Sequence, residues 1–294
     1  MFVRFRSAVL ICAIGIWSLY PTTGAAQEIV KFEATDPYAS DKVVLRAELF
    51  KPDGAGPFPA VILMHGCGGW QPAVRYSLHT HADYLVKNGY VVLSLDSFGP
   101  RGYSGDDLCA SNARLRDAID YRTHDAFDAL RYLQALSFVD AADIFLMGQS
   151  NGGSVAMQAA KAIGPTDYNK SHTAFRAVAA YYPWCGIFAD SRQALASPLM
   201  VFAGGKDDWV SARECSNLRA EGADFQVVVY PEAPHSFDLD IIPQRYLGHM
   251  IGNDAQAAKN SEERMLTFFD DHLTADLKRE RLMAAKTTET TEVR

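Results

Sequence analysis

The sequence predicts an α/β fold, with a mostly parallel sheet of about eight strands and helices on both of its faces. Apolar runs rich in β-forming residues alternate with segments of helical periodicity along most of the 294 residues. Most of these runs are continuously apolar, which indicates strands that are covered on both faces. With 48% hydrophobic and 21% charged residues, the composition is that of an ordinary globular protein and excludes a disordered chain.

The predicted elements follow one another in a regular order. Residues 29–34 and 43–50 are expected to form an antiparallel entry into the sheet. The later strands are expected at 60–65, 90–95, 143–147, 177–182, 198–202 and 225–230. Helices are expected at 76–88, 114–135, 150–163, 212–222 and 256–272. The connection 183–197 is too short for a large cap domain, so a single domain without one is predicted.

Residues 1–26 have the three parts of a secretory signal peptide. Two arginines precede the apolar run 8–20, and small residues stand just before the expected cleavage site. The apolar run is too short to span a bilayer, which needs roughly 20 helical residues, so a retained anchor is the less favoured alternative. We expect cleavage after Ala26, with Ala25 as the alternative. The prediction is export to the periplasm or the extracellular space without a stable membrane anchor.

After cleavage, the α/β domain is expected at 27–277, followed at 278–294 by a polar tail predicted to be mobile. The exported chain keeps four cysteines, which allow three disulfide connectivities in an oxidising compartment. We favour the two pairs that would each join loops at the same edge of the predicted sheet. These pairs are Cys67 with Cys109 and Cys185 with Cys215.

Charge and ligand spacing exclude several classes of partner. The 28 basic and 35 acidic residues give a net charge of −7, and no basic patch is present, so nucleic acid is not an expected partner. No pair of cysteines or histidines has the spacing of a zinc site. Neither a metal nor another cofactor is therefore expected.

The strongest motif is the G-x-S-x-G pentapeptide from Gly148 to Gly152, which follows an apolar strand and opens a helix. Its glycines are typical of a crowded strand-to-helix turn that has no room for side chains. Such a turn places Ser150 at the end of a central strand and at the positive end of a helix. Ser150 is the predicted nucleophile.

A nucleophilic serine needs a base and a third group that orients the base. An acid is expected just past the strand 198–202, where we favour Asp207 over its neighbour Asp208. His235 lies in the loop after the following strand and is the only one of the eight histidines so placed. The predicted triad is Ser150, Asp207 and His235.

Two backbone N–H groups are expected to stabilise the negative oxygen of a tetrahedral intermediate. One belongs to Asn151, directly after the nucleophile, and the other comes from the glycine-rich loop after the strand 60–65. In that loop we name Cys67, with Gly68 as the alternative. His65 is expected to brace the loop by hydrogen bonds rather than to act as a base. The Cys67 thiol is expected to be paired rather than nucleophilic.

Two side chains are weaker candidates for contact with substrate. Arg101 follows the fourth strand and is expected either to hold an anionic substrate group or to form a structural ion pair. Trp209 belongs to a group of aromatic residues that either line the pocket or pack in the interior. The others in this group are Phe98, Tyr103 and Trp184.

These residues resemble the dienelactone hydrolase family of the α/β-hydrolase fold. The matching segments are 65–69, 96–102, 148–152, 205–209 and 235–237, spread over nearly the whole exported chain. The family's lactone-opening enzymes have a cysteine nucleophile, a glutamate in the oxyanion loop and an arginine four residues after the histidine. Here these positions are Ser150, Gly66 and Leu239, so dienelactone itself is not the expected substrate.

The resemblance implies a secreted serine hydrolase that cleaves a small-molecule carboxylic ester or lactone without a cofactor. Two alternatives keep the same residues: a peptidase or acyltransferase with this triad, and a non-catalytic binding protein on a hydrolase scaffold.

Overall fold

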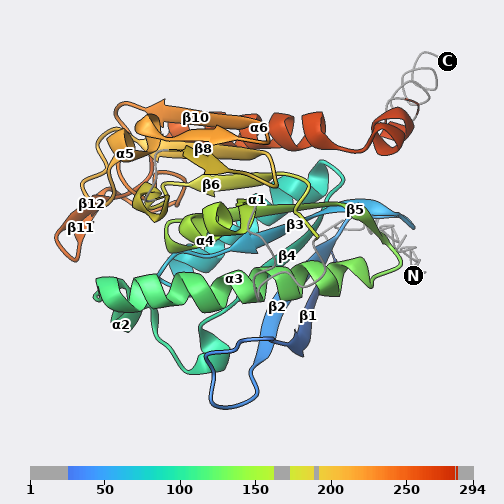
Figure 1. Ribbon diagram of the computed structural model, residues 1–294, viewed down its shortest axis with the longest axis horizontal. Helices are drawn as coiled ribbons and strands as arrows, with labels where there is room; N and C mark the ends of the chain where they lie inside the picture. Colours follow the sequence, from blue (N-terminus) through green and yellow to red (C-terminus); the bar gives the residue numbers. More distant parts are fainter. Residues whose placement is uncertain (1–25, 162–172, 189–191, 282, 284–294) are drawn as a thin grey trace, which may run out of the picture.

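The computed structural model describes residues 26–161, 173–188, 192–281 and 283, and its centre is an eight-stranded sheet (Figure 1). The strand order is β1-β2-β4-β3-β5-β6-β8-β10, in which β1, β2 and β4 pair antiparallel and all later neighbours pair parallel. The strands are β1 (Ala26–Glu33), β2 (Val44–Lys51), β3 (Phe58–Met64), β4 (Val91–Asp96), β5 (Val139–Gln149), β6 (Val178–Tyr181), β8 (Leu199–Gly204) and β10 (Phe225–Tyr230). The predicted α/β fold with an antiparallel entry is confirmed.

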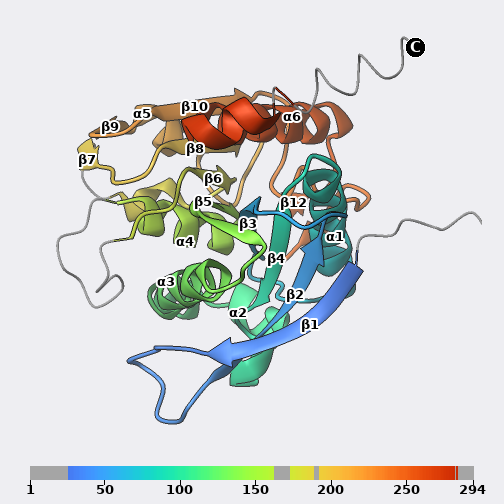
Figure 2. The same ribbon diagram turned by 90° about the vertical axis from the view of Figure 1, so that its right-hand side faces the viewer.

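Helices cover both faces of the sheet, as Figure 2 shows. One face carries α3 (Asn112–Gln134), α4 (Asn151–Ala160) and the short α5 (Ala212–Asn217), and the other carries α1 (Pro72–Lys87) and α6 (Ala255–His272). Three shorter helices lie in the connecting loops: α2 (Gly105–Cys109), η1 (Gly99–Arg101) and η2 (Cys185–Ile187). Within the described ranges, no inserted cap domain is present. The last two residues of the helix predicted at 150–163 lie outside the described residues.

Alternate residues of the central strands build two separate cores. In β3, Ala60, Ile62 and Met64 pack toward α3 and α4, whereas Val61 and Leu63 pack toward α1 and α6. All five side chains are fully buried. This burial on both faces is the physical reason for the continuous apolar runs in the sequence.

The helix predicted at 212–222 is only partly correct. It ends at Asn217, and β9 (Arg219–Glu221) then pairs in parallel with β7 (Arg192–Ala194). An ion pair of 2.9 Å between Arg192 Nη1 and Glu221 Oε1 joins the two short strands. Tertiary pairing therefore overrides a helical local pattern here.

One further feature differs from the predicted boundaries. The helical residues 275–281 continue past the expected domain end at 277, and Arg281 bonds Asp270 and lies over the ring of Tyr90. Most of the predicted tail, and nearly all of the predicted signal peptide, lie outside the described residues. Among the helices that are described, none combines the length and the apolar character that crossing a membrane requires.

Candidate active site

Ser150 sits on a sharp turn between β5 and α4. Its backbone has φ of 52° and ψ of −116°, a conformation that non-glycine residues rarely adopt. A Cβ atom on Gly148 would lie 2.0 Å from the carbonyl oxygen of Gly152, and one on Gly152 would lie 2.2 Å from that of Met64. The turn therefore requires glycine at both flanking positions, as the pentapeptide predicts.

The structure brings Ser150, His235 and Asp207 into one hydrogen-bonded chain. His235 Nε2 lies 2.9 Å from Ser150 Oγ, and its Nδ1 lies 2.7 Å from Asp207 Oδ2. The other carboxylate oxygen of Asp207 accepts hydrogen bonds of 2.9 Å from the N–H groups of Trp209 and Val210. The side chains of His235 and Asp207 are almost fully buried. His235 lies in the loop after β10, and Asp207 lies in the loop after β8. The carboxyl ends of these two parallel strands meet at one edge of the sheet.

The loop after β3 lies directly against the serine. A Cβ on Gly66 would be 3.3 Å from the Ser150 Cβ, so a larger residue would crowd the nucleophile. Cys67 and Asn151 both line the cavity that contains Ser150. Within the described residues, the backbone N–H groups of Cys67 and Asn151 have no hydrogen-bond acceptor. Gly68, the alternative donor, lines a second cavity beside Ser150.

His65 is buried beneath this loop and braces it. Its Nδ1 lies 2.7 Å from the carbonyl oxygen of Gly66, and its Nε2 accepts a hydrogen bond from the Ser97 N–H at 3.3 Å. These partners assign the ring proton to Nδ1. Burial, together with the positive charge of Arg122, lowers the pKa of His65 well below its usual range. The ring is therefore a neutral structural group.

Both disulfides favoured from the sequence are present. Cys67 bonds Cys109 of α2, and Cys185 of η2 bonds Cys215 of α5. The first bond ties the loop after β3 to α2, so it fixes the segment that carries the Cys67 N–H. The second lies at the same edge of the sheet, between the loops that follow β6 and β8.

Two cavities of about 240 and 210 Å³ meet at Ser150 and His235. Trp209 lines both of them, with its ring 5.1 Å from the ring of His235 and stacked on His249 at 4.8 Å. The other residues that line the first cavity include the apolar side chains of Trp184, Leu115, Ile119 and Val210 and the polar ones of Arg116, Asn112 and Ser154. The second is bordered by the hairpin of β11 (Gln244–Tyr246) and β12 (His249–Ile251), which the sequence analysis missed.

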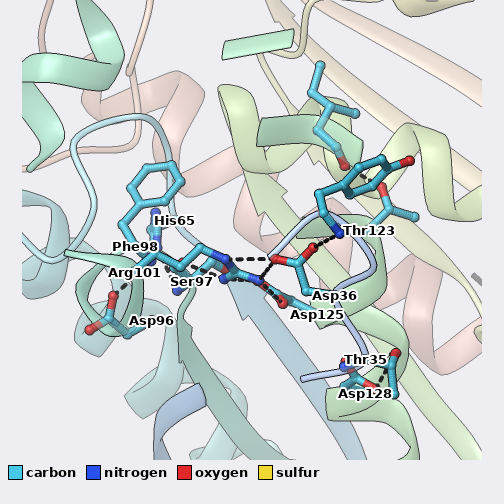
Figure 3. A network of polar contacts seen from close by, with 12 residues as sticks. Thr35, Asp36, His65, Asp96, Ser97, Phe98, Arg101, Thr123, Asp125 and Asp128 are labelled. Carbon is cyan, nitrogen blue, oxygen red and sulfur yellow. Dashed lines mark hydrogen bonds and ion pairs between the residues drawn. The ribbon is translucent and has the colours of Figure 1, made fainter. Parts of the chain in front are cut away.

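Arg101 does not contact these cavities, which corrects its expected role in substrate binding. Its guanidinium reaches between Asp36 and Asp125, at 2.7 and 2.9 Å, and also donates to the carbonyl oxygen of Ser97 (Figure 3). Only 6% of the side chain is exposed. Two carboxylates already neutralise this cation, so the structural ion pair is the alternative that applies. Phe98 is likewise an interior residue, packed edge-on against His65.

A second buried polar cluster, which the sequence analysis did not identify, lies behind the triad. Asp238, the third residue after His235, accepts hydrogen bonds from His81 Nε2 at 2.8 Å and Gln149 Nε2 at 2.6 Å. It also accepts one from the hydroxyl of Tyr182, whose ring lies 4.7 Å from that of His235. Asp238 thereby joins the histidine loop to the residue that precedes Ser150. The sequence signal was a histidine on the apolar face of α1, where a buried polar partner is needed.

His81 is expected to make stability depend on pH. Burial opposes its charge, but the carboxylates of Asp238 and Glu262 outweigh that effect and raise the pKa of His81 to about 9. Because the folded-state value exceeds the unfolded value of roughly 6.5, this stabilisation is complete below pH ~6.5 and is lost as the pH rises through ~9. The loss amounts to about 3 kcal/mol.

Urea unfolding of the disulfide-intact protein between pH 6 and 10 measures this effect. His81→Gln is expected to flatten the decline in the free energy of unfolding. His79, which is 33% exposed and pairs with Glu48, lies two residues earlier on α1, and His79→Gln is expected to keep this decline. An equal decline in the wild type and in His81→Gln would contradict the assignment.

Metal ligands are not grouped in the part of the chain that the structure describes: no three His, Cys, Asp or Glu side chains there are placed to hold an ion.

The fold and the site together define an α/β-hydrolase with serine at the strand-to-helix turn. The family model of the dienelactone hydrolases matches residues 45–273, and the chain belongs to this family.

Two proteins are similar to this chain in sequence, and one solved structure is similar in fold. A Yersinia pestis protein named "Putative carboxymethylenebutenolidase" is 27% identical over 258 residues, which cover 82% of this chain and 88% of that protein. Mouse acyl-coenzyme A thioesterase 5 is 28% identical over 287 residues, but the match covers 79% of this chain and 64% of the thioesterase. The apo structure of Thermogutta terrifontis esterase 2 has a TM-score of 0.58 at 20% identity, covering 85% of this chain and 95% of that one. The protein is thus a hydrolase related to enzymes named for cleaving ester and thioester bonds.

Proposed function

We propose that this protein hydrolyses carboxylic esters or lactones through an acyl-enzyme on Ser150. The observation that carries the proposal is the chain of hydrogen bonds from Ser150 Oγ through His235 to Asp207, at 2.9 and 2.7 Å. A serine hydroxyl is a poor nucleophile unless a base accepts its proton and a third group orients that base. Membership of the dienelactone hydrolase family supports the same chemistry.

In the first half of the reaction, Ser150 Oγ attacks the ester carbonyl while His235 Nε2 takes its proton. Asp207 holds the other ring nitrogen as the N–H donor and stabilises the imidazolium that forms. The N–H groups of Cys67 and Asn151 bind the negative oxygen of the tetrahedral intermediate. His235 then gives its proton to the leaving alcohol oxygen as the carbon–oxygen bond breaks, which leaves the acyl group on Ser150.

In the second half, His235 takes a proton from a water molecule that attacks the acyl carbonyl. The same two N–H groups bind the second negative oxygen. Collapse of this intermediate releases the acid and returns the proton to Ser150. The cycle uses only groups of this chain and water, so no cofactor is required.

The two cavities support a small ester with a substituent on each side of the reacting carbonyl. Both meet at Ser150, and their volumes of about 240 and 210 Å³ suit compact acyl and alcohol groups. Trp209, which borders both, is the proposed substrate-contacting residue. Because the position four residues after His235 is Leu239, the lactone carboxylate of dienelactone has no arginine there.

Export is the second part of the proposal. Two disulfides are typical of proteins that fold in an oxidising compartment, and a signal peptide is predicted at 1–26. The intact mass of the purified protein therefore is expected to correspond to a chain that begins at Gln27, or at Ala26, with no free thiol.

The test is a fluorophosphonate probe, which reacts with activated serines, followed by intact mass. We expect one adduct on the wild type and none on Ser150→Ala or His235→Ala. Ser216→Ala, which removes an exposed hydroxyl from α5, is the matched control and should label like the wild type. Hydrolysis of p-nitrophenyl butyrate should fall by about 10⁴-fold or more in Ser150→Ala.

A folded wild type that takes no adduct would contradict the proposal and favour a binding protein. An adduct that persists in Ser150→Ala would place the reactive serine elsewhere. Labelling without ester hydrolysis, but with cleavage of peptides or transfer to an added alcohol, would favour the peptidase or acyltransferase alternative.

A further inference from the structure

Arg122 is a completely buried cation within the core of the domain. It lies on the inward face of α3, one turn from Ile119 and from Ala126, and it is the largest fully buried side chain of the described residues. Its guanidinium lies over the ring of Phe98, 4.7 Å from the centroid. A position of this kind on an amphipathic helix is normally apolar.

The charge of Arg122 has no carboxylate partner. Within the described ranges, no acidic oxygen lies at ion-pair distance from its guanidinium. The carboxylates whose charges act on Arg122 are already engaged: Asp125 with Arg101 at 2.9 Å and Asp96 with Arg46 at 2.7 Å. Burial lowers the pKa of Arg122 to about 10, so the group remains positive at neutral pH.

Burying an unpaired charge is costly, and the Nε of Arg122 has no partner among the described residues. A methionine or leucine would fill similar space without that cost. A buried charge without an acidic partner points to a task that a neutral side chain does not perform.

The hydrogen bonds of Arg122 indicate what that task is. Nη2 donates to the carbonyl oxygen of His65 at 2.6 Å, and Nη1 donates to the side-chain Oδ1 of Asn151 at 2.7 Å. His65 opens the loop that carries the Cys67 N–H. Asn151 is the residue after Ser150 and carries the second N–H. One guanidinium therefore bridges the two chain segments whose N–H groups face the reacting carbonyl in the proposed mechanism.

We propose that Arg122 is a positioning residue for the oxyanion hole, which fixes the spacing of the Cys67 and Asn151 N–H groups and places a positive charge behind the negative oxygen. The inference rests on the proposed function. Because both N–H groups act on the tetrahedral intermediate rather than on the bound ester, loss of Arg122 should lower kcat and leave KM nearly unchanged.

The test compares Arg122→Met and Arg122→Lys with Arg131→Met. Arg131 is on the same helix but pairs with Asp128, outside the site, so its loss controls for a general weakening of α3. Two inhibitors of the same chain length are measured: a trifluoromethyl ketone, which forms a hemiketal oxyanion with an activated serine, and the matching methyl ketone, which binds as a ground-state ligand.

In Arg122→Met we expect kcat to fall about 10²–10³-fold. Affinity for the trifluoromethyl ketone should fall by the same factor, while affinity for the methyl ketone is retained. Arg122→Lys keeps the charge and should recover part of both losses. Arg131→Met should match the wild type in kcat and in both affinities.

Equal loss of affinity for the two ketones would mean that Arg122 only supports the fold, and wild-type kcat in Arg122→Met would remove any role; either result overturns the inference. If Arg122→Met does not fold, Asn151→Ala removes one acceptor of the bridge and should show the same selective loss at smaller magnitude. An Asn151→Ala protein that loses affinity equally for both ketones, or for neither, would also overturn the inference. Failure of the proposed function appears separately, as a wild type that does not react with the fluorophosphonate.

Discussion

Asp207→Asn is expected to lower kcat about 10⁴-fold while the protein remains folded. In the wild type, Asp207 Oδ2 accepts the Nδ1–H of His235, which leaves Nε2 without a proton and able to accept one from Ser150. The asparagine amide can present an N–H to Nδ1 and so favour the tautomer that carries its proton on Nε2. A protonated Nε2 cannot act as the base.

Asp208→Asn is the matched control for this variant. Asp208 is 44% exposed and accepts a hydrogen bond from the Met250 N–H at 2.9 Å, away from the ring of His235. Its replacement should leave most of kcat in place. The measurement is kcat on p-nitrophenyl butyrate, with the rate of fluorophosphonate labelling and the midpoint of thermal unfolding for both variants. A larger loss in Asp208→Asn than in Asp207→Asn would reverse the assignment of the acid.

The sequence predicted those site residues that directly follow a strand. Ser150, Asp207 and His235 each stand just after an apolar strand, and parallel strands bring their carboxyl ends to one edge of the sheet. The disulfide pairs could be favoured on the same ground, because each cysteine lies in a loop at that edge. The order of strands and their following loops was sufficient for these expectations.

The missed residues depend on contacts between segments whose spacing carries no local signal. Arg122 and His81 are recognisable only as polar side chains on helix faces that the periodicity marks as apolar, and their partners lie 29 and 157 residues away. The hairpin β11–β12 consists of two three-residue strands, too short for a period of two to stand out. Arg101 was a substrate-binding candidate because its loop follows a strand at the edge where the pocket was expected. Its charge is instead paired with Asp36, which lies far away in the sequence, so the ion pair could not be read from the loop alone.

For the variant Gly148→Ala, the conformational preference of the strand and the packing of the turn predict opposite effects on stability. Gly148 lies within β5, where alanine is favoured over glycine by about 0.5–1 kcal/mol because it loses less backbone freedom on folding. The structure predicts the opposite result. The added Cβ would lie 2.0 Å from the carbonyl oxygen of Gly152 and 2.4 Å from its carbon, and both are backbone atoms of the turn that holds Ser150.

Because a backbone contact of this kind is relieved only by moving the turn, we expect Gly148→Ala to lower the free energy of unfolding by about 3 kcal/mol and to abolish fluorophosphonate labelling. Gly102→Ala is the control: its φ of +71° is unfavourable for alanine, but no atom lies within 4 Å of the added carbon. That variant should lose only about 1 kcal/mol and label normally. Urea unfolding and intact mass measure both quantities. A Gly148→Ala protein that is more stable than the wild type and still reacts with the probe would mean that the turn relaxes freely, and the strained conformation of Ser150 would then not be needed for its reactivity.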